Sequence, residues 1–256
     1  MSARSLPCRT LWSLLGLLLL LLGWHVLALQ LGPLLMATPQ QTWQGLGRLL
    51  STPDFAFHAA ASLLRVAAGV GLGISIGLVT ALLAARSERL RLLLEPLRWL
   101  LMSVPPVIVV VLAMLWLGMG TAMVVVIAVV LLAPNVYVNT LRGLHLLDPD
   151  LGEMAQVYRL GRWQRLRHVA LPALAVPLCS ALHVACCSGV RLVVMAEVIG
   201  AANGAGFALA HARGSLDSAA LYAWVLLVLL LVAAMELVLL RPLQRRMTRW
   251  QRQPSH

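Results

Sequence analysis

The sequence has no lysine and very little charge of either sign. All twenty of its basic residues are arginine, and only nine residues are acidic. A nucleotide-binding GxxxxGK[ST] loop requires a lysine, so this chain cannot hold ATP in such a loop. Charged residues make up 11% of the 256 residues, whereas soluble domains carry about 25%. Because a soluble fold could not bury the 61% of residues that are hydrophobic, the composition indicates a membrane protein.

The motifs of metal centres and catalytic sites are also missing from the sequence. The four cysteines form no CxxC pair, and the histidines form no HExxH pattern. The ionisable residues fall in segments expected on opposite sides of a membrane, which argues against a membrane-embedded enzyme. The net charge of +11 could indicate nucleic-acid binding, but the arginines lie between apolar runs. We therefore expect no catalytic residue, no metal site, no cofactor bound by this chain and no nucleic-acid partner.

Six apolar segments are long enough to cross a bilayer, since a spanning helix needs about 20 residues. They lie at 11–31, 58–84, 97–117, 121–140, 173–196 and 220–240. The sequence thus predicts an all-α polytopic bundle of about six transmembrane helices. The first segment follows two arginines, as in a signal peptide, but no small-x-small cleavage site follows it, so we expect a retained span.

The arginines are distributed unevenly between alternate connecting segments. If the N-terminus lies inside, sixteen arginines fall in inner segments, and Arg48 and Arg213 fall in outer ones. Cytoplasmic segments of membrane proteins are enriched in basic residues. We therefore expect a multi-pass protein of the bacterial inner membrane, with both termini in the cytoplasm.

These spans suggest three regions along the chain. Residues 1–57 would hold the first transmembrane helix and a periplasmic or interfacial segment, 58–241 a core of five helices, and 242–256 a basic cytoplasmic tail. Within the second span, Gly69, Gly71, Gly73 and Gly77 predict close helix packing, because small residues let membrane helices approach.

One polar segment within the core, at 148–172, is expected to form a cytoplasmic two-helix loop. Asp148 is a suitable N-cap, and Pro149 fits the first position of a helix. Gly161 interrupts the pattern, and a second, basic helix leads to Leu171 and Pro172, where the next span begins. Two short helices at an angle make a compact knob that suits docking into a groove on a partner.

This loop resembles the EAA loop of the permease subunits of binding-protein-dependent ABC importers. Glu153, Ala155, Val169, Leu171 and Pro172 fall in the spacing of that motif. Two positions depart from the motif, because Met154 stands at its first alanine and Arg159 at its glycine. Gly161, two residues later, is then the expected turn. The resemblance implies that the ATPase is contacted through the loop 142–172, by Glu153, Met154, Ala155, Tyr158, Arg159, Gly161, Leu171 and Pro172.

Further segments resemble the nitrate, sulfonate and taurine branch of these permeases. They include Ser62–Val66 with Gly69, Val104–Pro106, Ala196-Glu197 and Gly204–Gly206. The resemblance implies a translocation path for a small anion, a second permease copy, an ABC ATPase dimer carrying ATP and Mg, and a periplasmic or lipid-anchored substrate-binding protein. Lipid is the other expected partner. A vitamin precursor is an alternative substrate, and an ATP-independent secondary transporter is a rival from another class, although the paired acids and broken-helix repeats expected of it are not evident in the sequence.

A charge inside a span is costly, so charged residues in or near the expected spans are candidates for a functional role. Arg65 lies about two turns into the second span, and either packing or a place near the substrate path would explain it. Arg191 and Glu197 lie near the outer end of the fifth span, either as a structural pair or as part of a gate. We take all three as candidates for the pore or gate.

Overall fold

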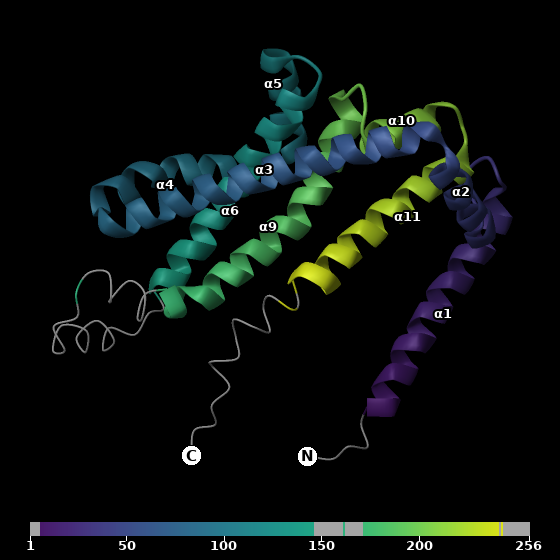
Figure 1. Ribbon diagram of the computed structural model, residues 1–256, viewed down its shortest axis with the longest axis horizontal. Helices are drawn as coiled ribbons and strands as arrows, with labels where there is room; N and C mark the ends of the chain where they lie inside the picture. Colours follow the sequence, from purple (N-terminus) through teal and green to yellow (C-terminus); the bar gives the residue numbers. More distant parts are fainter. Residues whose placement is uncertain (1–5, 146–160, 162–170, 241, 243–256) are drawn as a thin grey trace.

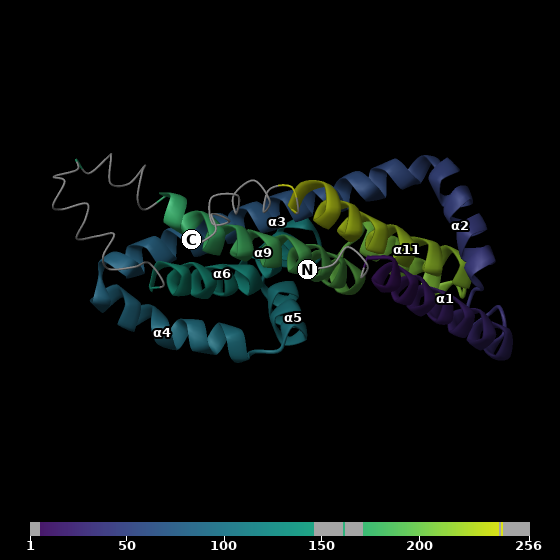
Figure 2. The same ribbon diagram turned by 90° about the horizontal axis from the view of Figure 1, so that it is seen from below.

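A computed structural model describes residues 6–145, 161, 171–240 and 242 (Figures 1 and 2). All secondary-structure elements among these residues are helices. The predicted all-α class is confirmed. Five described helices are long and apolar enough to cross a bilayer, and a sharply bent pair could supply a sixth span. In chain order the elements are α1 (Leu6–Leu31), α2 (Pro39–Ser51), α3 (Pro53–Arg86), α4 (Glu88–Ser103), α5 (Pro106–Leu117), α6 (Thr121–His145), α9 (Leu171–Gly200), α10 (Ala205–Gly214), α11 (Ser218–Ala234) and a π-helical end, η2 (Met235–Leu240).

The core forms where α3, α6 and α9 pack together. Its fully buried side chains include Met123, Ile127 and Leu132 from α6 and Val193 from α9. With 34 residues, α3 is about 50 Å long, well beyond the roughly 30 Å hydrocarbon core, so it must tilt or protrude. The long α3 therefore provides a surface against which the other core helices are placed.

Glycines at four-residue intervals bring α3 close to α6. A Cβ atom added to Gly69 would lie 2.6 Å from the Cβ of Ala128, and one added to Gly77 would lie 2.6 Å from the carbonyl oxygen of Ala133. At Gly73 the corresponding distance to Leu132 Cβ is 3.1 Å. The predicted packing role is confirmed for these three positions. It is wrong for Gly71, which faces open space because it lies half a turn away from the packed stripe.

The expected third span, 97–117, is not a single helix. It is divided between α4 and α5, which meet at an angle of 101°. Pro105 and Pro106 cause the break, because neither has an N–H to continue a helix and each disfavours helical geometry in the residue before it. Val104 and Pro105 are accordingly extended, and Pro106 begins α5. In Figure 1, α4 runs back beside α3 while α5 points away from it.

Tight turns join the elements on the far side of the core from the α3–α4 turn. A tight turn lies between Leu117 and Thr121, with positive φ angles at Gly118 (70°) and Gly120 (141°) that favour glycine. The Gly120 N–H donates to the carbonyl oxygen of Gly200, 3.0 Å away, at the end of α9. This hydrogen bond ties the start of α6 to the turn that leads into α10.

Helices α1 and α2 lie at the edge of the bundle (Figure 1). A capping box starts α2, in which Thr38 and Gln41 bond to each other's backbone. Helix α2 packs on α11 so closely that a Cβ atom on Gly45 would lie 2.8 Å from the carbonyl oxygen of Ala219. Trp24 of α1 donates to the carbonyl oxygen of Ala37 at 3.0 Å, whereas most of the apolar surface of α1 is exposed.

Candidate functional site

A buried ion pair joins two of the candidate residues. An Nη1–Oε1 distance of 2.8 Å separates Arg65 of α3 from Glu197 of α9, and the two side chains are 3% and 0% exposed. The expected pair between Arg191 and Glu197 is therefore wrong, and Arg191 is an exposed residue of α9. Side chains six residues apart on a helix point to different faces. Arg191 therefore does not point towards α3 as Glu197 does.

Arg65 uses every N–H group that it has. A guanidinium carries five donors, and five hydrogen bonds leave this one. Besides the bond to Glu197, two reach Thr121 Oγ1 at the start of α6, at 3.2 and 3.0 Å. Two more reach Asn203 in the α9–α10 turn, one to its carbonyl oxygen at 2.8 Å and one to its side-chain Oδ1. Arg65 is thereby fixed, and in this conformation it has no donor left for a substrate.

Side chains from α3 and α9 also hold the first N–H groups of α10. The Gly206 N–H donates to Glu197 Oε2 at 3.0 Å, and the Ala205 N–H donates to Ser62 Oγ at 2.7 Å. Ser62 in turn donates to Glu197 Oε2 at 2.7 Å, and the Gly204 N–H donates to His58 Nδ1 at 3.1 Å. These N–H groups have no partner within α10, and the negative charge of Glu197 suits the positive end of the helix dipole.

Two glycines make room for Glu197 at this helix start. A Cβ atom on Gly204 would lie 2.5 Å from Glu197 Oε1, and the φ angle of Gly204 is 106°. A Cβ atom on Gly206 would lie 2.4 Å from the carbonyl oxygen of Val194 and 2.5 Å from Glu197 Cβ. Larger residues would therefore push α10 away from α9 and separate the carboxylate from the N–H groups it binds.

Together these residues form one closed network, which we call the polar clamp. It contains His58, Ser62, Arg65, Thr121, Glu197, Asn203 and the backbone N–H groups of 204–206. The clamp joins α3, α6, α9 and α10, and its two charges neutralise each other. An anion would reach Arg65 only if the clamp opened. Opening is unfavourable, because removing one partner of a buried ion pair costs about 3–5 kcal/mol.

The sequence alone predicts only part of the clamp. Arg65 and Glu197 stood out as charges in apolar segments, whereas Asn203, Thr121 and His58 were not recognised as their partners. A polar and glycine-containing turn directly after a buried glutamate, as at Asn203 and Gly204, is the signal that could have pointed to them.

Most of the predicted ATPase-contacting residues fall outside the described residues. These are Glu153, Met154, Ala155, Tyr158 and Arg159. The two short helices expected for the loop also fall outside the described residues. Gly161 is exposed, and Leu171 and Pro172 are the first two residues of α9, where proline is well tolerated. Their contact with an ATPase stays a prediction.

Known proteins resemble this chain over most of its length. Residues 69–249 match the family described as binding-protein-dependent transport system inner membrane component. The chain is 30% identical over 239 residues to the taurine transport system permease protein TauC of Escherichia coli (strain K12), covering 91% of this chain and 86% of that one. It is 29% identical over 194 residues to the putative aliphatic sulfonates transport permease protein SsuC of Bacillus subtilis (strain 168), covering 75% and 70%.

A solved structure shows the same fold. The inward-facing MetNI methionine ABC transporter aligns with a TM-score of 0.63 at 20% identity, covering 74% of this chain and 94% of the matched chain. At this identity the likeness supports the architecture alone. Since the family match spans well over half of the sequence, the chain belongs to the binding-protein-dependent transport system inner membrane components, the multi-pass permease subunits of ABC importers.

Proposed function

We propose that this permease carries a small sulfonate compound, such as taurine or an aliphatic sulfonate, into the cell. The observation that carries the substrate class is that two relatives aligned over most of the chain, TauC and SsuC, are named for taurine and aliphatic sulfonates.

Within this function, the polar clamp positions the gate. Arg65 and Glu197 hold the α9–α10 turn against α3 and the start of α6, so the end of the pathway near α10 has a fixed shape while the clamp is closed. Arg191 is exposed on α9, six residues before Glu197, and is the candidate that would meet an anion directly. Arg65 would meet it only in a conformation in which the clamp has opened.

The energy for transport comes from a partner chain. A permease of this family works with an ATPase and a substrate-binding protein. In our proposal two permease copies form the pathway, ATP and Mg are bound by the ATPase dimer, and the 148–172 loop transmits nucleotide-driven closure through Glu153. Closure then shifts the permease between two conformations that face opposite sides of the membrane.

The arrangement of the connecting segments is consistent with the orientation expected from the arginines. In Figure 1 the α3–α4 turn, the end of α6 and the start of α9 lie together at the left, whereas α2 and α10 lie at the upper right. The first group borders the arginine-rich segments, and the second group contains Arg48 and Arg213. This separation supports the orientation derived from the charges.

Sulfonate uptake tests the proposal directly. Cells that lack their own sulfonate importers would receive this chain together with the ATPase and binding protein of its source, and would be grown with taurine as the sole sulfur source. We expect growth and uptake of labelled taurine, both lost when Glu153 is changed to Arg. Growth on sulfate is the matched control, and a strain that accumulates a vitamin precursor or nitrate but no sulfonate would overturn the substrate class.

A further inference from the structure

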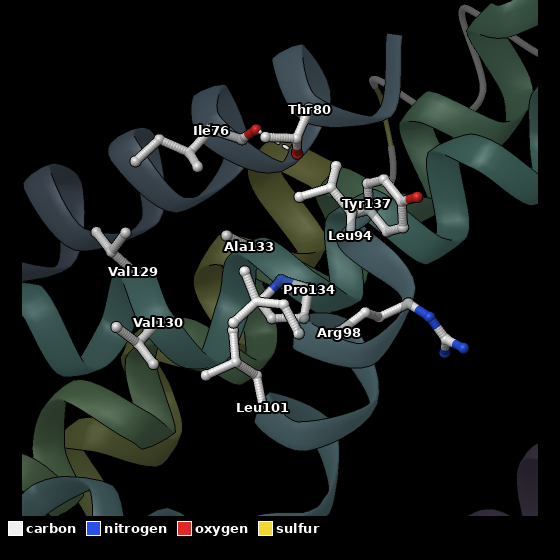
Figure 3. Close-up of a pocket in the computed structure, with 11 residues that line it drawn as sticks. Ile76, Thr80, Leu94, Arg98, Leu101, Val129, Val130, Ala133, Pro134 and Tyr137 are labelled. Carbon is white, nitrogen blue, oxygen red and sulfur yellow. Dashed lines mark hydrogen bonds between the residues drawn. The ribbon is translucent and has the colours of Figure 1, made fainter. Parts of the chain in front are cut away.

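Helices α3, α4 and α6 enclose an apolar slot at the end of the bundle near the α3–α4 turn. It is partly open to its surroundings and has a cavity volume of about 230 Å³. Its walls include Ile76 of α3, Leu94 and Leu101 of α4, and Val129 and Ala133 of α6 (Figure 3). Val130, Pro134 and Tyr137 of α6 also line the slot.

A basic rim adjoins one end of this slot. A second pocket, lined by Arg91, Glu95 and Arg98 of α4 and by Arg142 of α6, shares Arg98 and Tyr137 with the slot. Figure 3 shows the Arg98 guanidinium and the Tyr137 hydroxyl on the same side of the slot, opposite Val129 and Val130. Around the α3–α4 turn, 86–98, and at Arg142, the chain carries five arginines against two glutamates.

The glutamates do not prevent an anion from binding at this rim. Glu95 pairs with Arg98, and Glu88 pairs with Arg91 at 3.7 Å, each within α4 and partly exposed. Exposed pairs of this kind contribute between 0 and about 1 kcal/mol. A phosphate, which accepts bidentate hydrogen bonds from a guanidinium, can therefore displace or share these contacts.

Tyr137 provides an independent sign of a ligand. Its side chain is 4% exposed, and within the described part of the chain its hydroxyl has no hydrogen-bond partner. Buried hydroxyl groups normally have a partner, and leaving one without costs free energy. The hydroxyl lies at the border between the apolar slot and the basic rim, which is where a donor would meet an ester or phosphate oxygen of a bound amphiphile.

The order of these groups along the helices matches one leaflet of a bilayer. From Val129 to Tyr137, α6 rises about 12 Å, and from Val129 to Arg142 about 20 Å. One half of the hydrocarbon core is about 15 Å deep. Apolar wall, hydroxyl and arginines therefore follow one another at the depths of acyl chain, glycerol ester and phosphate.

We propose that this slot and rim bind one anionic phospholipid, with an acyl chain between α3, α4 and α6 and its phosphate at Arg91, Arg98 and Arg142. A small free anion would gain nothing from the apolar walls, and a zwitterionic lipid would gain less from the excess of arginines. The lipid would brace α4 against α6 directly beside the end of α6 that leads into the ATPase-contacting loop. Basic pockets between membrane helices on the cytoplasmic side are suited to such headgroups.

Native mass spectrometry of the full chain in mild detergent tests this site. The chain would be titrated with palmitoyl-oleoyl phosphatidylglycerol and with palmitoyl-oleoyl phosphatidylcholine, which share their acyl chains. We expect one saturable phosphatidylglycerol site with a Kd at least about tenfold lower than that of phosphatidylcholine. The Arg98→Gln/Arg142→Gln variant should lose about fivefold in affinity for each arginine removed.

Two further variants separate this site from general effects. Tyr137→Phe keeps the shape of the side chain and removes a hydroxyl without a partner, so the lipid-free protein should melt at or above the parent temperature while phosphatidylglycerol affinity falls about two- to tenfold. Arg48→Gln/Arg213→Gln removes the same charge elsewhere and should leave the affinity unchanged. The proposal is overturned if phosphatidylcholine binds equally well, if the control pair weakens binding as much, or if millimolar inorganic phosphate or taurine displaces the lipid, since a free-anion site would then be present.

Discussion

Neutralising Glu197 is the sharpest test of the polar clamp. Glu197→Gln keeps the size of the side chain, but the amide group must replace an oxygen that accepts hydrogen bonds. Oε1 accepts from Arg65, and Oε2 accepts from Ser62 and from the N–H of Gly206. In either orientation of the amide, an NH₂ group meets at least one donor, and Arg65 keeps a buried charge without its counter-ion.

The expected loss of stability is large. Removing one partner of a buried ion pair costs about 3–5 kcal/mol, and each kcal/mol lowers the melting temperature of a chain of this size by about 2–4 °C. We therefore expect Glu197→Gln to melt about 6–20 °C below the parent in mild detergent. The matched control is Glu88→Gln, which breaks an exposed pair and should change stability by less than about 1 kcal/mol.

A double substitution shows whether the two charges act as a pair. Arg65→Met with Glu197→Met leaves no unpaired charge, so its loss should be smaller than the sum of the two single losses by about 1–3 kcal/mol. It should not return to the parent value, because Asn203, Thr121 and the N–H groups of α10 also lose partners. A Glu197→Gln variant that melts within about 2 °C of the parent, or no lower than Glu88→Gln, would refute the clamp.

Three further substitutions follow from the packing and from a helix cap. Gly77→Ala places a Cβ atom 2.6 Å from the carbonyl oxygen of Ala133 and should lower the melting temperature clearly, whereas Gly71→Ala, which faces open space, should not. Gly206→Ala meets a backbone oxygen at 2.4 Å and should reduce the yield of folded protein in fluorescence-detected gel filtration, and a normal yield would contradict the close contact. Thr38→Ala removes the capping box of α2 and should cost about 1 kcal/mol in a melting assay, and an unchanged melting temperature would show that the cap is not used.

Composition and hydropathy predicted the class of the fold, because apolar length records whether a segment can cross a bilayer. Hydropathy does not show where a helix changes direction, so the window 97–117 combines the end of α4 with α5. The signal was present in the sequence, since Pro105 and Pro106 cannot continue a helix. The glycine spacing was also informative, and Gly71 could have been separated from Gly69, Gly73 and Gly77 by its position on the other side of the helix.

The clamp shows where sequence reasoning reached its limit. The sequence suggests Arg191, six residues away, as a partner for Glu197, although residues six apart on a helix do not face each other. Its partner Arg65 is 132 positions away, and no local pattern links them. The family resemblance placed Ser62, Glu197 and Gly204–Gly206 in separate motifs, and only the three-dimensional structure brings them to one helix start.

Co-purification with the ATPase tests the central claim, that this chain is the permease of an ATP-driven importer. The tagged chain would be expressed with the ATPase of its source, extracted in mild detergent, and analysed for a complex, with Glu153→Arg as the matched variant. We predict a stable complex that the substitution abolishes while the chain still inserts into the membrane. A well-folded chain that never retains the ATPase, or that moves taurine in vesicles without it, would contradict the account and favour a secondary transporter.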